Sequence, residues 1–481
     1  MKHIEEQIAA IVALVILTGC AVGPNYNPPQ TSVAASFANA PTNTAAADET
    51  ALATWWNGFG DATLSDLVAQ AIAHNHNLRI ATANLKEARA LRRLAIFDLA
   101  PTVQANAGYT DSLLSKAAAV PGTPRNLRQN ELYDASFDAT WELDLFGRVR
   151  RSVQAATADV GSVEATRQDV LVSLTAEIAR NYFELRGEQN QLAVARKNAD
   201  VQTKTLEITQ SLLEGGRGTD FDVSRSRALV NLTLSTIPPL EAAIQKAIYR
   251  LTVLTGRQPH ALPTELSTPG SLPAAMPALA LGDPEALLRR RPDIRAAERS
   301  LAGATARIGI ATADLFPRVT FVGSVGLQAS TFAGLGKGGA DTWTFGPQLT
   351  WAALDLGRVH ARIKAADARA EASLASYELT VITALEETED ALVDFEREQI
   401  RQRFLEASAQ ASQQASDLAH QRYEAGASDF LSVLDAERSL LEAQDRLAAS
   451  QTQTATSLVA VYKALGGGWE IATSINRSNG K

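Results

Sequence analysis

The sequence predicts a mainly α-helical protein with a β-barrel portion, built from two internal repeats. Three observations lead to this prediction. Many residues recur at a fixed spacing of 210 positions, as Trp141 and Trp351 do. Each half contains 68 consecutive residues without proline, 147–214 and 357–424, which is enough for a helix of about 100 Å. Each half also contains segments in which apolar and polar residues alternate, which is the pattern of a strand with two different faces.

The repeat divides the chain into two similar halves, 61–256 and 283–466. Upstream of the long helices the spacing becomes 216, because Pro101 matches Pro317. The first half therefore carries six extra residues between Pro101 and Trp141. A proline-rich connection joins the halves. Since a repeat of this length is one structural unit, we expect both halves to fold alike.

The chain begins with a candidate secretion signal. Ile8 to Leu17 is an apolar run of ten residues, which is too short to span a bilayer as a helix but fits the core of a signal peptide. It ends in Leu17-Thr-Gly-Cys20, which resembles a lipobox, where the cysteine is acylated and becomes the first residue of the mature protein. We expect a signal peptide over 1–19 and a covalent lipid on Cys20. The alternative is an ordinary signal peptide with an incidental cysteine.

The residues around this signal qualify the prediction in two ways. Glu5 and Glu6 oppose Lys2, so the leading segment is not clearly basic. The stretch after the cysteine is rich in Pro, Asn, Ala and Thr, which predicts an extended tether over 20–60.

Cys20 is the only cysteine, so no disulfide can form within the chain. The net charge of −8 argues against nucleic acid, and the six scattered histidines indicate no metal site, so we expect no cofactor besides the lipid.

Four alternating segments predict two β-hairpins, over 101–145 and 317–356. The apolar face of one segment is formed by Tyr133, Ala135, Phe137, Ala139, Trp141 and Leu143. The opposite face carries acidic groups, which suit a water-filled lumen. The strands are close to the ~9–11 residues that cross a bilayer when tilted. The alternative is a sheet packed on a helical core, and Pro347 inside a strand would require a local bulge.

Four strands cannot close a barrel, and an open sheet edge is not tolerated in lipid. Several chains must then share one barrel. Two chains would give eight strands, whose interior side chains roughly fill. Three chains would give twelve strands and leave a lumen, so a pore requires at least a trimer.

The long helices carry apolar stripes on two nearly opposite sides. Leu185, Leu192 and Leu206 belong to one stripe, and Val194 and Val201 belong to the other. A helix with two stripes is held on both sides, as a stave in a wall would be. Shorter helices are expected on either side of these long ones, over 61–99, 219–255, 292–315 and 428–465.

Each long helix ends at a glycine turn before the chain returns. Gly216 and Gly426 are expected to end helices in the left-handed conformation. Thr219 and Ser428 are expected to be the N-caps of the returning helices.

Motifs along nearly the whole chain together resemble one family. They are Leu17-Thr-Gly-Cys-Ala-Val-Gly-Pro-Asn-Tyr-Asn-Pro28, Trp55-Trp56, Trp141-Glu-Leu-Asp-Leu-Phe-Gly-Arg148, Arg290-Arg-Pro-Asp-Ile-Arg-Ala-Ala-Glu298, Phe316-Pro317 and the two glycine turns. The chain resembles the outer membrane factor family of TolC-like and OprM-like export channels, and most closely its NodT-type lipoprotein branch. Ala21 after the cysteine also suits sorting to the outer membrane in bacterial lipoproteins.

This resemblance implies a homotrimer in the outer membrane, lipid-anchored and extending into the periplasm. Four transmembrane strands per chain would form a twelve-stranded barrel, and long antiparallel helices would form a periplasmic α-barrel. A periplasmic adaptor protein would dock on the helical tips, and an inner-membrane pump, of the RND type, would supply the cargo. The implied function is the passive outer membrane conduit of a tripartite efflux system. An exit duct for protein secretion shares the fold and remains an alternative.

The resemblance also implies two sets of site residues. The adaptor-docking tips would be Gly216, Gly218, Thr219, Gly426, Ser428 and Val433. The periplasmic gate would be Asp435, Asp222, Asp220 and Tyr423. Asp435 matches one aspartate of the family's constriction ring, but the other ring position falls on Ser432. Asp222, which lies 210 positions before Ser432, is the expected substitute.

The remaining function classes have little support. The Gly215-Gly-Arg-Gly stretch lacks the lysine of a phosphate-binding loop, and there are no catalytic residues or metal ligands to name, so we expect no enzyme. A helical scaffold lipoprotein without a pore would leave the alternating hairpins unexplained. We therefore divide the chain into 1–19, 20–60, helix 61–100, strands 101–145, helical hairpin 146–256, connection 257–283, helix 284–316, strands 317–356, helical hairpin 357–466 and tail 467–481.

Overall fold

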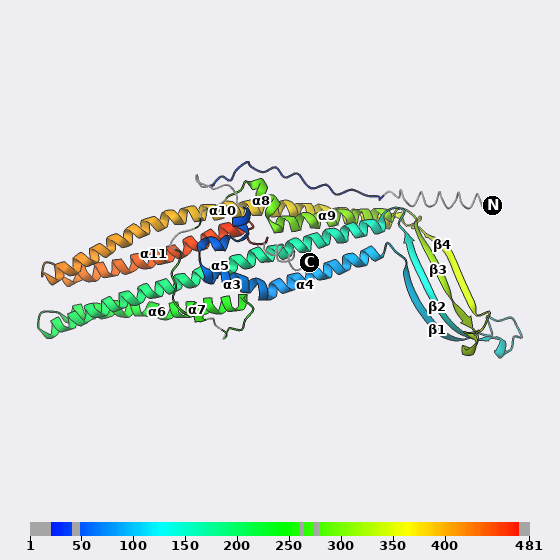
Figure 1. Ribbon diagram of the computed structural model, residues 1–481, viewed down its shortest axis with the longest axis horizontal. Helices are drawn as coiled ribbons and strands as arrows, with labels where there is room; N and C mark the ends of the chain where they lie inside the picture. Colours follow the sequence, from blue (N-terminus) through cyan, green and yellow to red (C-terminus); the bar gives the residue numbers. More distant parts are fainter. Residues whose placement is uncertain are drawn as a thin grey trace. The chain divides into compact units, whose positions relative to one another are not determined.

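The computed structural model describes residues 21–40, 49–259, 261, 264–273, 277, 279 and 281–470 (Figure 1). Cys20 and the signal lie outside the described residues. The described chain forms two units. The sheet unit comprises residues within 1–30, 84–164 and 296–378, and the hairpin unit comprises residues within 31–83, 165–295 and 379–481.

The sheet unit contains one antiparallel sheet of four strands in the order β1-β2-β3-β4 (Figure 1). The strands are β1 (Thr102–Leu113), β2 (Gln129–Leu143), β3 (Arg318–Ala329) and β4 (Asp341–Thr350). β1 pairs with β2 and β3 pairs with β4, which confirms the two predicted hairpins. β2 also pairs with β3, so the two halves of the repeat share one sheet.

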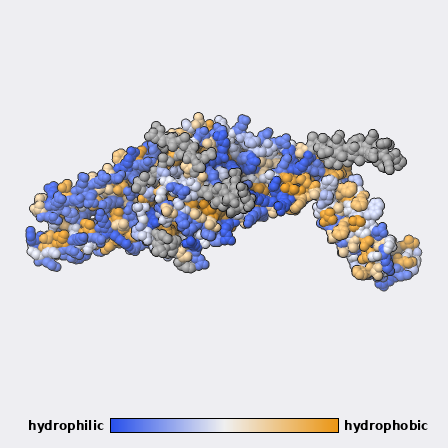
Figure 2. All heavy atoms as spheres, in the orientation of Figure 1, coloured by the Kyte–Doolittle hydropathy of each residue, from blue (hydrophilic) through white to orange (hydrophobic). Residues whose placement is uncertain are grey.

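The register gives this sheet one apolar and one polar face. Thr102 lies opposite Thr140, Tyr133 opposite Ala329, and Arg318 opposite Thr350. Odd-numbered residues therefore share one face across all four strands, and even-numbered residues share the other. Large exposed side chains of the odd face include Val103, Tyr109, Phe137, Phe321, Val325, Leu327, Trp343, Phe345 and Leu349. Figure 2 shows hydrophobic residues over the strands.

Pro347 corrects one prediction, because no bulge accompanies it. It lies opposite Phe321, and the register continues unbroken from Gly346 to Gln348. Within the described chain β4 is an edge strand, and a proline is tolerated there when its nitrogen faces away from the partner strand.

Four helices form two hairpins. α5 (Arg148–Glu214) has 67 residues and α10 (Leu356–Glu424) has 69, and both begin in the sheet unit. The returning helices α6 (Asp220–Leu254) and α11 (Phe430–Ala464) have 35 residues each. α6 continues through Pro238 and Pro239, which confirms the single helix expected over 219–255.

Shorter elements complete the described chain. They are α2 (Glu49–Ala53), η1 (Trp55–Phe59), α3 (Ala62–His74), α4 (His76–Phe97), η2 (Arg125–Leu127), α7 (Thr264–Ser267), α8 (Pro284–Arg290), α9 (Pro292–Ala313) and η3 (Phe332–Gly334). Among these and the long helices, none is both long and apolar enough to cross a membrane. The core of the hairpin unit gathers around η1, where the Trp55 ring stacks on Tyr462 at 4.9 Å and Phe59 packs on Phe183 at 4.8 Å.

The single helix expected over 61–99 is in fact two helices, α3 and α4. Asn75 interrupts them in an extended conformation. Its side-chain amide donates to the backbone oxygen of Leu254 at 2.9 Å, and its oxygen accepts from the Leu78 nitrogen. Arg291 holds the matching place between α8 and α9 and donates to the backbone oxygen of Ala464 at 3.0 Å. Leu254 and Ala464 are themselves 210 residues apart, so each break fastens the end of its own returning helix.

Candidate functional site at the helical tips and the strand–helix junction

The first tip is a tight turn between α5 and α6. Gly216 has φ of +67°, which confirms the predicted left-handed helix end. The nitrogens of Arg217 and Gly218 both donate to the backbone oxygen of Leu212, at 2.8 and 2.9 Å. A Cβ atom on Gly218 would lie 2.9 Å from the Leu213 nitrogen, so this close approach requires glycine.

The second tip repeats this turn between α10 and α11. Gly426 has φ of +70°. The Ala427 nitrogen donates to the backbone oxygen of Arg422 at 2.8 Å, as Arg217 does in the first tip. A Cβ atom on Gly216 or Gly426 would meet nothing within 4 Å beyond its chain neighbours, so both turns have open space around the glycine.

The N-caps confirm one prediction and correct another. Thr219 caps α6 by accepting a hydrogen bond from the Asp222 nitrogen at 3.2 Å. Ser428 does not cap α11, because Asp429 does, accepting from the Ser432 nitrogen at 3.2 Å. The repeat spacing could have revealed this, since Asp429 lies 210 positions after Thr219, and aspartate is a favoured N-cap.

The two caps use the same pair of groups with the positions exchanged. In the first tip the Thr219 hydroxyl donates to the Asp222 carboxylate at 2.6 Å. In the second tip the Ser432 hydroxyl donates to the Asp429 carboxylate at 2.6 Å. This hydrogen bond holds the pKa of the Asp429 carboxyl below its ordinary value. The acid missing at Ser432 is therefore present three residues earlier.

Among the predicted gate residues, Asp222 and Tyr423 are the pair for which the described chain shows an interaction. Asp222 and Tyr423 come near each other across the two tips. The pKa of the Tyr423 hydroxyl is raised by partial burial and then by the Asp222 charge, against an opposing effect of Arg217. Asp220 is exposed in the first turn of α6, and Asp435 is exposed on α11. Neither has a side-chain hydrogen bond or ion pair within the described ranges.

Val433 does not fit the predicted docking role. It is 0% exposed and lies in a small core with Phe430 and Leu434, against which Tyr423 packs. The Tyr423 and Phe430 rings are 5.3 Å apart. Val433 therefore supports the tip from inside and presents no surface to a partner.

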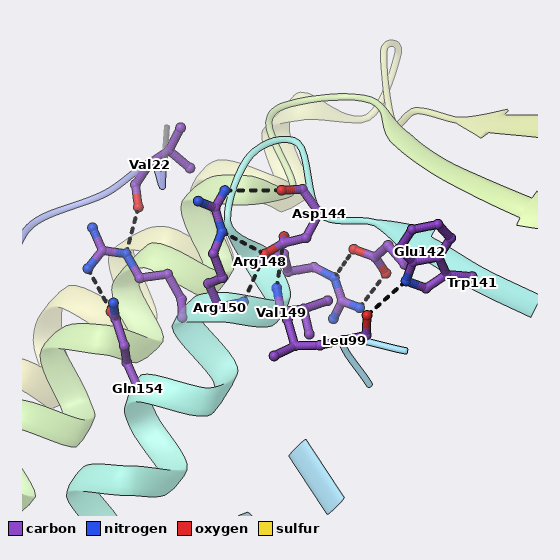
Figure 3. Close-up of polar contacts among 10 residues, drawn as sticks. Val22, Leu99, Trp141, Glu142, Asp144, Arg148, Val149, Arg150 and Gln154 are labelled. Carbon is purple, nitrogen blue, oxygen red and sulfur yellow. Dashed lines mark hydrogen bonds and ion pairs between the residues drawn. The ribbon is translucent and has the colours of Figure 1, made fainter. Parts of the chain in front are cut away.

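At the opposite end of the long helices, matched tryptophans join each strand pair to its helices. The Trp141 indole nitrogen donates to the backbone oxygen of Leu99 at 3.0 Å (Figure 3). Trp351 donates to the backbone oxygen of Leu315 at the same distance. Both tryptophans follow the 210 spacing, and both carbonyls follow the 216 spacing. The repeat seen in the sequence is thus a repeat of contacts.

Charged groups fix the start of α5 at this junction. The Arg148 guanidinium donates to Glu142 at 2.8 Å, and the Asp144 carboxylate accepts from the backbone nitrogens of Val149 and Arg150 (Figure 3). A carboxylate at a helix N-terminus pairs with otherwise unsatisfied N–H groups and with the helix dipole. The angle between strand and helix is therefore held by ionic hydrogen bonds.

The tether after Cys20 is bound at the same junction. The Val22 nitrogen donates to the backbone oxygen of Phe146 at 3.1 Å. Arg151 donates to the backbone oxygens of Val22 and Gly23 and to the Asn25 side chain. A Cβ on Gly23 would lie 2.5 Å from the Gly309 Cα, so this crossing requires glycine.

Comparison with known proteins supports this geometry. The sequence matches the family described as outer membrane efflux protein over residues 67–257 and 284–467. The chain belongs to the outer membrane efflux protein family. Nodulation protein T of Rhizobium leguminosarum bv. trifolii is 31% identical over 458 residues, covering 94% of this chain and 96% of that protein. The toluene efflux pump outer membrane protein TtgI of Pseudomonas putida is 31% identical over 470 residues, covering 96% and 98%.

Solved channels share the fold of this family member. The outer-membrane channel OprN is 41% identical, with a TM-score of 0.86 over 94% of this chain and all of that one. The open state of the Neisseria gonorrhoeae MtrE outer membrane channel is 29% identical, with a TM-score of 0.81 over 94% of this chain and 99% of that one. The predicted mainly helical fold with transmembrane strands, the outer membrane location and the efflux channel function are thereby confirmed.

Proposed function

We propose that three copies of this chain form the outer membrane conduit of a tripartite efflux system. The observation that supports this most directly is that odd-numbered residues lie on one face of the sheet and even-numbered residues on the other. One face is apolar and exposed in all four strands, the other is polar, and β1 and β4 each have an edge without a partner in the described chain. Joining three such sheets edge to edge would give twelve strands with an apolar exterior and a wet lumen.

The lipid on Cys20 is part of this proposal. The tether is held from Val22 onward where β2 passes into α5, so an acylated Cys20 would lie two residues from that junction. Replacing Cys20 with serine should abolish incorporation of labelled palmitate while leaving the trimer folded. Unchanged labelling in the serine variant would contradict the lipid site.

We place the docking of a periplasmic adaptor at the glycine turns. Gly216, Gly218, Thr219, Gly426 and Ser428 lie in or beside two turns of the same geometry. A repeated turn with open space at its glycine offers backbone groups to a partner. An inner-membrane pump of the RND type would act through that adaptor.

The entrance would be narrowed by carboxylates at the tips. Three copies of Asp435, exposed on α11, would stand around a three-fold axis and favour cations. Asp220, Asp222 and Tyr423 would contribute from the neighbouring turn, although Asp222 is also engaged with Thr219. Small molecules are the proposed cargo, because relatives carry names such as toluene efflux pump and solvent efflux pump outer membrane proteins.

The experiment is a growth assay in a strain that lacks its own outer membrane efflux channel and carries a matching pump and adaptor. Restored resistance to an organic solvent or antibiotic would support the conduit. Normal outer membrane trimers without any restored resistance, with several pump and adaptor pairs, would contradict it. Recovery of a secreted protein without drug resistance would instead favour the protein-secretion duct.

A further inference from the structure

A buried carboxylate joins the two helical hairpins above the tips. Glu437 of α11 is 3% exposed. Its Oε1 atom accepts a hydrogen bond from the Thr205 hydroxyl of α5 at 2.7 Å and lies 3.0 Å from Nε2 of His420 of α10. Since α5 belongs to the first hairpin and α10 and α11 to the second, one oxygen atom contacts both hairpins.

Glu437 is the end of a polar ladder along the seam between α5 and α11. The Asn190 side-chain amide donates to the Gln451 side-chain oxygen at 3.3 Å, and the Asn198 side-chain amide donates to the Gln444 side-chain oxygen at 2.9 Å. Along α11 these partners are spaced by seven residues, from Gln451 to Gln444 to Glu437, which is the heptad spacing of packed helices. The first two rungs are neutral amides. The rung nearest the tips is the ionisable one.

This rung does not follow from the repeat. The positions 210 residues before Glu437 and His420 hold Arg227 and Gln210. The position 210 residues after Thr205 holds Ala415. The cluster therefore belongs to one seam only, and the repeated architecture does not need it.

The Glu437 carboxyl is half satisfied. Its Oε2 atom is buried and has no hydrogen-bond partner among the described residues. Burial raises the pKa of Glu437, while the hydrogen bond from Thr205 and the contact with His420 act in the opposite direction. A proton on Oε2 would remove the buried charge and leave Oε1 free to keep both contacts.

The surrounding charges are directed to solvent. Lys204 and Glu207 on α5, Asp417 on α10, Arg227 on α6, and Asp435 and Arg438 on α11 are all exposed. His420 is the titratable group in direct contact with the carboxyl. A change of charge at Glu437 therefore acts mainly on its contacts with Thr205 and His420 in the seam.

We propose that Glu437 is a proton-dependent latch between the two hairpins, closed when the carboxyl is protonated and loosened when it is charged. The proposal rests on the proposed function, in which the tips of the hairpins border the channel entrance. The sign follows from the direction of the shift. A carboxyl whose pKa is raised in the closed seam takes up its proton on closing, so the closed state is favoured at low pH and is lost as pH rises through that pKa.

The test is a distance measurement on the full-length oligomer, so it does not depend on conduction. Spin labels at Lys204→Cys on α5 and Ser439→Cys on α11, both exposed positions, report the separation of the hairpins. Raising the pH from 4, below the ordinary pKa of glutamate, to 8 should shift population toward longer distances, by about tenfold for each unit by which closure raises the pKa. A sample without the added cysteines checks that Cys20 takes up no label.

Three variants complete the experiment. Glu437→Gln should keep the short distance at both pH values, while the matched control Glu442→Gln, an exposed acid on the same helix, should shift as the parent does. Thr205→Val should show longer distances already at pH 4. Three results would each overturn the latch. They are label distances in the parent that do not change with pH, a Glu437→Gln variant that still shows the pH-dependent shift, and a Thr205→Val variant with the same distances as the parent. A working latch in an oligomer that restores no efflux would instead count against the conduit.

Discussion

The two halves of the chain perform the same turns with different residues. In the first half a hydroxyl caps the returning helix and an acid follows three residues later, whereas in the second half the acid caps and the hydroxyl follows. At the helix breaks, neutral Asn75 stands where charged Arg291 stands in the other half. The architecture therefore fixes where a polar contact must be, and each half is free to choose which chemical group makes it.

The two halves can therefore share a fold and still differ in the charge of the groups at matched positions. At the matched helix breaks, the ionised groups lie in the second half. Arg291 donates to Asp293 and to Glu387, both at 2.7 Å, in addition to its bond to Ala464. Asn75 has no charged partner among the contacts described for it. We therefore expect the second half to respond to pH and to substitution more strongly than the first.

The largest difference should appear at the helix breaks. Arg291→Ala removes charge-assisted bonds from a guanidinium whose side chain is 9% exposed, and should lower the free energy of unfolding by about 2–3 kcal/mol. Asn75→Ala removes neutral bonds and should cost about 1 kcal/mol. Denaturant unfolding of the purified protein measures both. Equal losses in the two variants would break the proposed contrast between the halves.

At the tips, a β-branched residue should be harmful in both halves. Gly426→Val and Gly216→Val place a bulky side chain in the left-handed region, at a cost of order 1–3 kcal/mol confined to the turn. We expect each to reduce export strongly while trimer levels stay normal, measured by drug resistance and by gel mobility. Gly336→Val, at a glycine with open space and no positive φ, is the control and should export normally. Loss in only one tip variant would show that docking uses the halves unequally.

The caps offer a smaller and more specific test. Asp429→Ala and Thr219→Ala should each cost about 1 kcal/mol, because each leaves helix N–H groups without their acceptor. Exchanging the second pair to match the first, Asp429→Thr with Ser432→Asp, should recover stability to within about 0.5 kcal/mol of the parent. Hydrogen exchange of the first turns of α6 and α11 checks this. An exchanged pair no more stable than Asp429→Ala would mean that the two tips differ in backbone as well as in side chain.

The smallest expected difference between the two tips is their response to low pH. The pKa of Asp429 is lowered in the folded tip, so the cap is fully present above the ordinary pKa of aspartate, near 4, and is lost as pH falls through the lower folded value. Amide protection at the start of α11 should therefore decline below about pH 4, and Asp429→Asn should remove that decline. A hydroxyl cap such as Thr219 does not titrate. An identical acid response in Asp429→Asn would assign the effect to another group.

The sequence predicted the features that depend on pattern. Parity along the strands, the two long proline-free runs, and the glycine turns at Gly216 and Gly426 are properties of neighbouring residues, and the structure confirms them. The matched Trp141 and Trp351 showed that the repeat was structural. These features follow from local preferences that the fold does not override.

The features that the sequence did not predict depend on contacts between distant segments. Asn75 is no strong helix breaker, and its break is stabilised by the end of α6, which lies 179 residues away in sequence. Pro347 needs no bulge because the register between β3 and β4 continues unbroken through it, which becomes apparent only when the pairing of the strands is known. The burial of Glu437 likewise depends on α5 lying against α11. The local sequence pattern does not indicate which distant segments will lie next to each other.

The conduit itself is tested most directly by single-channel conductance of the purified oligomer in a planar bilayer. We predict small, cation-selective steps in the parent, and larger, less selective steps when Asp435→Ala removes the proposed ring of carboxylates. Asp417→Ala, an exposed acid on α10, should leave the steps unchanged. A folded trimer that conducts no ions, with or without Asp435→Ala and after removal of both tips, would contradict the conduit.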